Sequence, residues 1–309
     1  MNSQTRKTTI GGQALIEGLM MKGPEKIAAA IRKPDGEIEI KEEAFKKPKS
    51  WYRRAPFIRG TFTFAETMAT GISYIAYSAE ASTGEEYEKD KLDEWIEKKF
   101  GEEKSGKIII GAAMVLGIGF SVLLFFILPT FLAGFASSFT DSSIIKNLIE
   151  GVVRIAIFVG YLAIVSGMKD MKRLFAYHGA EHKTIFCYEA GRDLTVENIR
   201  DMPRQHPRCG TSFLFLIMII SILVFSVVTW SSAWMRILIR LALLPVVVGI
   251  GYEVTRLIGR YDNLFTRILR APGMWLQNLT TNEPDDSMIE VAIAAVVRVI
   301  PEDKNSDRW

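Results

Sequence analysis

The sequence predicts a polytopic α-helical membrane protein, with about four transmembrane helices and a small cytoplasmic N-terminal region that contains β-strands. Two long stretches, residues 108–140 and 209–235, contain no charged side chain, and a helix needs about 20 apolar residues to cross a hydrocarbon core. Mean hydropathy is +0.15, and 24% of the 309 residues are charged. This balance excludes a disordered or fibrous chain. The net charge of +3 gives no indication of nucleic-acid binding.

Residues 1–55 form the predicted cytoplasmic β-containing region. Pro34–Asp35–Gly36 stands between the runs 28–32 and 37–40. Because proline presets φ and glycine accepts a positive φ, this tripeptide predicts a turn between two strands. The glycine-rich segment 11–21 is interpreted as a further strand with glycine breaks.

Residues 56–107 form a predicted helical connector. Between 56 and 79, apolar side chains recur at helical spacing and polar ones fall on the opposite face, which predicts an amphipathic helix on the membrane or against a packed core. The sequence does not choose between these two positions. Residues 80–107 are rich in Glu and Lys, as is typical of a solvated helix.

Residues 108–309 form the predicted transmembrane and metal-site domain. Arginines near the start of the fourth predicted span, Arg236 and Arg240, do not exclude a membrane helix, because their long stems can reach the interface. The first apolar run begins beyond residue 100, so no secretory signal peptide is expected. The four expected spans are Ile108–Phe131, Gly151–Met168, Thr211–Trp230 and Trp234–Tyr252.

The orientation follows from the distribution of Lys and Arg between the loops. The loop 169–210 carries many basic residues, whereas Lys146 is the basic residue in the centre of the loop between the first two spans. Cytoplasmic loops carry the excess of positive charge. We therefore expect this loop and both termini, including a helical tail over 253–309, on the cytoplasmic side of the cell membrane.

All three histidines lie in the predicted cytoplasmic loop. His178 and His182 belong to the string H-x-x-E-H, in which Glu181 precedes the second histidine. On a helix, positions i and i+4 share one face about 6 Å apart, so both imidazoles can bind one metal ion. The same spacing occurs in inverzincin metallopeptidases, where the glutamate is the general base. The alternative without a metal is that the two histidines are ordinary surface side chains.

Three further residues are candidate ligands. His206 and Cys209 form an H-x-x-C string, and imidazole and thiolate are both zinc ligands. Glu253 ends the fourth predicted span on the same side of the membrane, although an ordinary ion pair with Arg256 or Arg260 explains it equally well. Cys187 would face the opposite side of the helix that carries His178, and it is left out of the site.

Two kinds of metal site are compatible with these residues. Four protein ligands would make a closed, structural zinc site, whereas three would leave a position open for catalysis. An acid beside a ligand, Glu181, favours the open site. Zinc is the expected cofactor, and the sequence does not distinguish it from iron or manganese.

Several strings resemble the YqhQ-type family of bacterial membrane proteins. They include Gly11–Gly12–Gln13–Ala14 with Glu17–Gly18 and Gly23–Pro24, together with Arg59–Gly60, Tyr252–Glu253, and the blocks that start at His178, His206 and Pro272. The resemblance covers nearly the whole chain. It implies a membrane location and a metal, because the family is described as predicted metal-dependent enzymes. It implies no particular substrate.

These observations lead to a functional hypothesis and a rival. The hypothesis is a zinc-dependent hydrolase at the cytoplasmic membrane surface, with Glu181 as general base and a peptide or a lipid head group as substrate. The rival is a non-enzymatic assembly or scaffold protein held by structural zinc. The expected partners are membrane lipids and a membrane protein or lipid substrate. A transporter is disfavoured, because no predicted span carries an acid at its centre.

Overall fold

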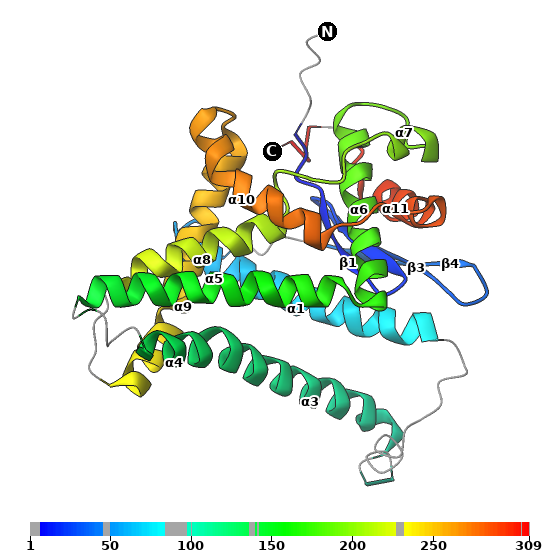
Figure 1. Ribbon diagram of the computed structural model, residues 1–309. Helices are drawn as coiled ribbons and strands as arrows, with labels where there is room; N and C mark the ends of the chain where they lie inside the picture. Colours follow the sequence, from blue (N-terminus) through cyan, green and yellow to red (C-terminus); the bar gives the residue numbers. More distant parts are fainter. Residues whose placement is uncertain are drawn as a thin grey trace. The chain divides into compact units, whose positions relative to one another are not determined.

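The computed structural model describes residues 7–45, 50–83, 98–99, 101–135, 140, 142–226, 232–303 and 305–308. Most of these residues are helical, and an antiparallel sheet lies near the N-terminus (Figure 1). The chain forms two compact units. The first consists of Met1–Ser82, Leu162–Ile220 and Pro245–Trp309, and the second of Thr83–Tyr161 and Ser221–Leu244. Most of the predicted charged segment 80–107 lies outside the described residues.

The sheet confirms the predicted N-terminal β-region. Its four strands are antiparallel in the order β1-β2-β3-β4. Gly36 adopts a φ of +89° in the turn predicted at Pro34–Asp35–Gly36, and its N–H donates to the Lys33 carbonyl. The glycine-rich segment forms two strands rather than one, because the chain reverses after Leu15. The strands are β1 (Gly11–Leu15), β2 (Gly18–Lys22), β3 (Lys26–Arg32) and β4 (Ile38–Ala44).

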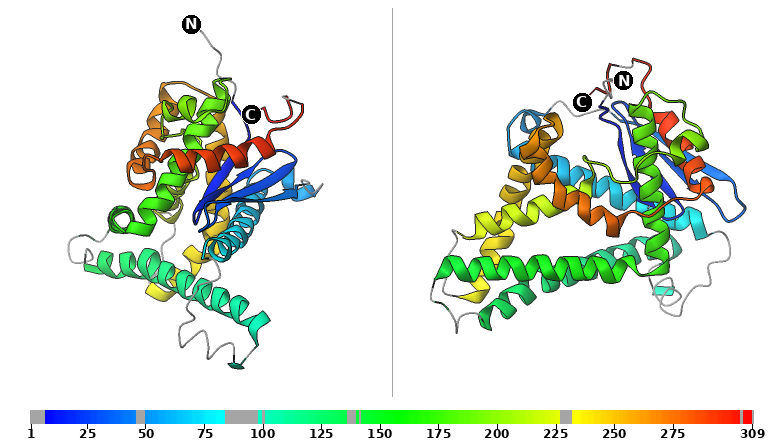
Figure 2. Two further views of the ribbon diagram at one scale, coloured as in Figure 1. Left: turned by 90° about the vertical axis from the view of Figure 1, so that its right-hand side faces the viewer. Right: turned by 45° about the horizontal axis from the view of Figure 1, so that its top comes forward.

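Helices cover both faces of this sheet in the first unit (Figures 1 and 2). Helices α6 (Lys169–Glu189) and α11 (Asp286–Val299) pack on one face, where Leu19, Met21, Ala28 and Ala30 are buried. Helix α1 (Ile58–Thr83) buries Tyr74 against Leu15 and Met20 on the other face. The amphipathic helix predicted over 56–79 therefore packs on a core through one of its faces. Asp285 caps α11 by accepting the Met288 N–H.

In the part of the chain that the structure describes, three helices have the length and composition to cross a membrane: Ile108–Gly134, Ile144–Ser166 and Trp234–Arg260. They correspond to three of the four predicted spans. The remaining one, α8 (Gly210–Ser226), is shorter, and its predicted end at Trp230 lies outside the described residues. The other elements described are a 3₁₀-helix (Trp51–Arg53), α3 (Glu102–Val122), a π-helix (Leu123–Ile127), α4 (Leu128–Gly134), α5 (Ser143–Ser166), α7 (Val196–Arg200), α9 (Ala233–Arg260) and α10 (Leu264–Thr280).

A buried charge cluster connects the apolar helices of the second unit. Glu150 of α5 and Arg240 of α9 form an ion pair, and their side chains are 1% and 2% exposed. Arg154 also pairs with Glu150, at 3.1 Å, and Thr130 donates to the same carboxylate at 2.8 Å. The Arg240 side chain is therefore buried among these helices with a carboxylate beside it, so its charge does not require extension toward an interface as the sequence suggested.

A proline creates the acceptor that holds Arg154. In an α-helix the residue at position 129 donates its N–H to the carbonyl of residue 125. Pro129 has no N–H, so the Phe125 carbonyl is left without this donor. The chain forms its π-helical turn over Leu123–Ile127, and Arg154 Nε donates to the Phe125 carbonyl at 2.9 Å. The irregular turn thus provides a hydrogen-bond acceptor for the Arg154 side chain in apolar surroundings.

Candidate metal centre

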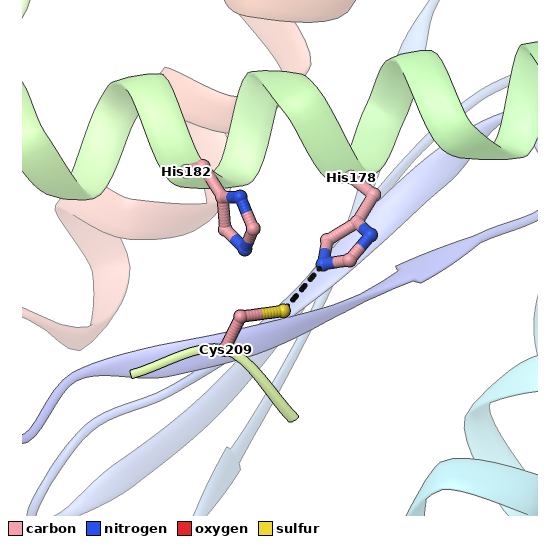
Figure 3. Close-up of side chains that lie close together, drawn as sticks. All are labelled: His178, His182 and Cys209. Atoms are coloured by element: carbon pink, nitrogen blue, oxygen red, sulfur yellow. Dashed lines mark hydrogen bonds between the residues drawn. The ribbon is translucent and has the colours of Figure 1, made fainter. Parts of the chain in front are cut away.

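Helix α6 carries the H-x-x-E-H string as the sequence predicts. His178 and His182 lie one turn apart on the same side of the helix, and their ring centroids are 4.4 Å apart (Figure 3). His182 is 2% exposed and Glu181 is 6% exposed. His178 is partly buried, so the two histidines are not an ordinary pair of exposed side chains.

Cys209 completes a group of three candidate ligands. It precedes α8, and its Sγ lies 3.2 Å from His178 Nε2. One ligand atom from each of Cys209, His178 and His182 lies within 4.8 Å of the other two. Zn–S and Zn–N bonds of about 2.3 and 2.0 Å at tetrahedral angles separate two ligand atoms by about 3.5 Å. The three side chains therefore fit one tetrahedral ion after small rotations.

Backbone carbonyls orient both imidazoles. His178 Nδ1 lies 2.7 Å from the carbonyl oxygen of Thr280, and His182 Nδ1 lies 2.5 Å from that of Arg204. A carbonyl only accepts, so each Nδ1 carries a proton, and in each ring Nε2 is the nitrogen left to face the centre of the group. Partners of this kind fix the tautomer and the ring orientation of metal-ligating histidines.

The electrostatics of the group favour a thiolate. Burial by itself raises the pKa of the Cys209 thiol, but the imidazoles of His178 and His182 outweigh it and hold this pKa well below its usual range. Burial likewise lowers the pKa of His178, yet the neighbouring Cys209 raises it to about 9. A thiolate is the form of cysteine that binds metals.

Glu181 lies beside this group and contacts the sheet. Its Oε1 accepts the backbone N–H of Gly12 at 2.9 Å. Burial raises the pKa of Glu181, while the two neighbouring histidines oppose that shift. Glu181 is not one of the three grouped ligands, so its carboxylate is available for another role.

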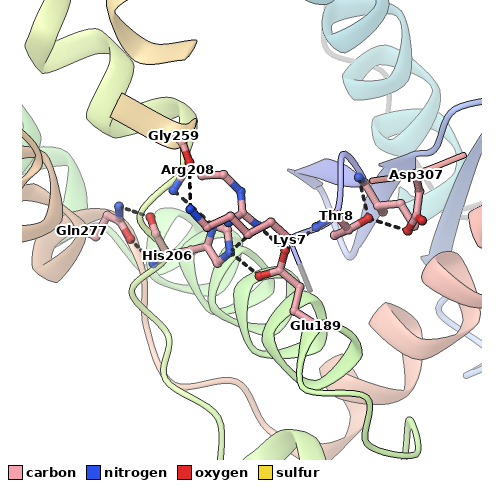
Figure 4. A network of polar contacts seen from close by, with 9 residues as sticks. Lys7, Thr8, Glu189, His206, Arg208, Gly259, Gln277 and Asp307 are labelled. Atoms are coloured by element: carbon pink, nitrogen blue, oxygen red, sulfur yellow. Dashed lines mark hydrogen bonds and ion pairs between the residues drawn. The ribbon is translucent and has the colours of Figure 1, made fainter. Parts of the chain in front are cut away.

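His206 belongs to a different network (Figure 4). Its Nε2 lies 3.7 Å from Oε2 of Glu189, and its Nδ1 accepts the N–H of Arg208 at 3.3 Å. The Gln277 side chain accepts the His206 N–H at 2.7 Å and donates to the His206 carbonyl at 2.9 Å. Both ring nitrogens are thus directed away from the group around Cys209, and His206 lies outside it.

The remaining sequence candidates also lie outside the group. Glu253 forms an ion pair with Arg59, whose Nε and Nη2 donate at 2.7 and 2.5 Å. An ion pair was the alternative that the sequence offered, but its partner is Arg59 rather than Arg256 or Arg260, because the fold brings α1 to this end of α9. Cys187 is buried with Ile199 and Ile289 in a separate apolar cluster.

Three supporting residues were not assigned roles from the sequence: Gly12, Arg204 and Thr280. Arg204 and Thr280 act through their carbonyls and Gly12 through its N–H. A backbone contact leaves no signature of residue type, so motif spacing does not find it. Gly12 and Thr280 do stand in strings that carry the resemblance to the YqhQ-type family, and that was the available signal.

Comparison with known proteins extends this resemblance. Residues 55–302 match the family described as "Protein of unknown function (DUF1385)". The chain belongs to the DUF1385 family. It is 35% identical over 290 residues to "Uncharacterized protein YqhQ" of Bacillus subtilis (strain 168), covering 92% of this chain and 89% of that protein. No solved structure matches the chain. The matched family region contains His178, His182 and Cys209, whereas Gly12 precedes it.

Proposed function

We propose that this chain is a metal-dependent hydrolase at the cytoplasmic face of the bacterial cell membrane. His178, His182 and Cys209 would hold a divalent ion, zinc by ligand type. Glu181 would be the general base. The substrate would be a peptide or a lipid head group.

One observation carries this proposal: within the described residues, three candidate ligands converge rather than four. Tetrahedral zinc with three protein ligands keeps one open position, as catalytic zinc sites do. His206, the residue that would close the site, is engaged by Glu189 and Gln277. A bound divalent ion would supply Lewis-acid chemistry that polarises a carbonyl or phosphoryl oxygen.

Glu181 has the properties that a general base requires. It is buried, it lies beside the ligands, and burial raises its pKa toward the range in which a carboxylate can accept a proton and return it. The Gly12 N–H holds one of its oxygens. The other carboxylate oxygen would face the attacking water.

Four membrane crossings, with both termini cytoplasmic, agree with the chain path. Cys209, at the start of α8, and Thr280, beyond α9, both contact His178 in one compact unit. In the proposed topology the chain would leave this unit along α8, cross the membrane, and cross it again along α9. Helix α8 would therefore be the fourth span, and membrane lipids would be partners of the protein.

A structural zinc site in a non-enzymatic scaffold is the second candidate function. The observation that favours it is the position of the three ligands, since a bound ion would join α6 to the start of α8. Such a link would stabilise the first unit without any chemistry. In that case Glu181 would only orient its neighbours.

The two functions are separated by metal content and turnover in detergent-purified protein. The hydrolase predicts about one zinc per chain in wild type, Glu181→Gln and Glu253→Gln, and little in His182→Ala. Cleavage of quenched peptides or phospholipid head groups should be lost in Glu181→Gln and kept in Glu253→Gln. A Glu181→Gln protein that supports full cellular function with its metal bound would favour the scaffold. Folded wild type without metal after chelator-free purification would contradict both candidates.

A further inference from the structure

Strand β1 forms one edge of the sheet and lies against α6. Its partner on one side is β2, and within the described residues no strand pairs with its other side. An edge strand presents unpaired N–H and C=O groups that can pair with another extended chain. This open edge adjoins the helix that carries Glu181 and the two grouped histidines (Figure 2).

The direction of the open edge follows from two alternate residues of β1. The N–H of Gly12 donates to Glu181, so it points away from β2. Alternate residues of an antiparallel strand point the same way. The peptide groups of Ala14, two residues along the strand, therefore face outward. Beyond the strand pairing, no partner within the described residues accepts the Ala14 N–H.

Gly12 brings this edge up to Glu181. A Cβ at Gly12 would lie 2.5 Å from the Met20 carbonyl oxygen and 3.1 Å from Glu181 Cδ, so a side chain would not fit. Gly12 itself is exposed to solvent. At Gly12, where the edge of β1 lies closest to Glu181, the strand therefore has no side chain that could cover its backbone.

We propose that the site takes an extended polypeptide as substrate, paired as an added strand with the open edge of β1. This inference rests on the proposed hydrolase function and chooses one of its two substrate classes. Strand addition uses main-chain hydrogen bonds at alternate residues. A polypeptide carries donors and acceptors at that spacing, and a lipid head group does not.

The position of Glu181 determines where the pairing stops. A peptide can exchange hydrogen bonds with Ala14, but at Gly12 the N–H is already taken by Glu181. The next peptide carbonyl is therefore left unpaired beside the acid and the ligand group. In hydrolysis, the oxygen of a water bonds to that carbonyl carbon and the C–N bond breaks. Glu181 accepts a proton from the water and delivers it to the leaving nitrogen.

The test removes one outward N–H from the edge. Ala14→Pro deletes this donor, and proline is tolerated on edge strands where the N–H faces outward. Ala14→Val is the matched control, because it adds similar bulk and keeps the N–H. The probe is a pool of internally quenched octapeptides with zinc-loaded protein. Ala14→Pro should lower kcat/KM about tenfold relative to Ala14→Val, with the same zinc content in both variants, and tenfold corresponds to about 1.4 kcal/mol.

Each other outcome is decisive. Equal rates for Ala14→Pro and wild type would overturn the strand pairing, as would hydrolysis of phospholipid head groups without peptide cleavage, and the hydrolase proposal would survive both. If zinc-loaded wild type hydrolyses neither class, the hydrolase proposal fails. Fluorescence anisotropy of the same octapeptides then decides the pairing: binding weakened by Ala14→Pro alone supports it, and no binding overturns it.

Discussion

His206 Nε2 lies 3.7 Å from Glu189 Oε2, in a buried network outside the three-ligand group. Glu189 also accepts the N–H of Thr8 at 2.6 Å and pairs with Arg208. The network joins the N-terminal segment to the turn before Cys209. We infer that His206 supports the fold around the candidate metal centre and lies outside its ligand set.

The first prediction concerns His206→Gln, which should retain the metal of the wild type and lose stability. Burial lowers the pKa of His206, so the folded chain favours the neutral ring. This contribution is complete above the ordinary histidine pKa of about 6.5 and decreases as the pH falls below it. The difference in Tm between wild type and variant should therefore shrink from pH 7.5 to pH 5.5, as measured by differential scanning fluorimetry.

The neighbouring residue Gln205, which lies outside the buried network, provides the control for that measurement. Gln205→Ala should leave both metal content and the pH profile unchanged, because Gln205 contacts Asn278 at the surface. Loss of metal in His206→Gln, in protein that remains folded, would show that His206 is a ligand after all.

A second prediction tests the carbonyl that orients His178. A Cβ at Gly179 would lie 2.0 Å from the carbonyl oxygen of Asn282, so Gly179→Ala must displace the segment that contains Thr280. We expect a loss of about 1–3 kcal/mol in stability, as for other overpacked sites, together with weaker zinc binding in a competition titration with a chromophoric chelator.

Gly160→Ala is the matched control, because nothing lies within 4 Å of its Cβ position in α5. This variant should bind zinc like the wild type. If Gly179→Ala bound zinc equally well, Thr280 would not be required to orient His178.

The third prediction concerns the charge cluster of the second unit. Glu150→Gln leaves the buried Arg154 and Arg240 without a carboxylate, and breaking a buried ion pair costs about 3–5 kcal/mol. The variant should lose most of its monodisperse peak in size-exclusion chromatography and unfold at a lower temperature.

Glu66→Gln removes a more exposed pair, that with Arg53, and should cost about 0–1 kcal/mol. A Glu150→Gln protein as stable as this control would mean that the two arginines do not depend on the Glu150 charge.

Local patterns were sufficient for much of this protein. The apolar runs predicted helices long enough to cross a membrane because helix length scales with residue number. The spacing of His178 and His182 predicted a shared face because i and i+4 are neighbours on any α-helix. Pro34–Asp35–Gly36 predicted its turn through the φ preferences of proline and glycine.

Long-range packing decided what these patterns left open. His206 and Cys209 precede α8 in an irregular turn, where no periodicity relates the directions of two side chains. Contacts with Gln277 and Glu189 hold His206 away from the ligand group. The Cys209 thiol, in contrast, contacts His178. The partners of Glu253 and Arg240 were likewise undetermined, because a charge pairs with whichever opposite charge the fold brings near. The sequence by itself determined the candidate ligands and the helices that carry them, and only the tertiary structure decided which three meet.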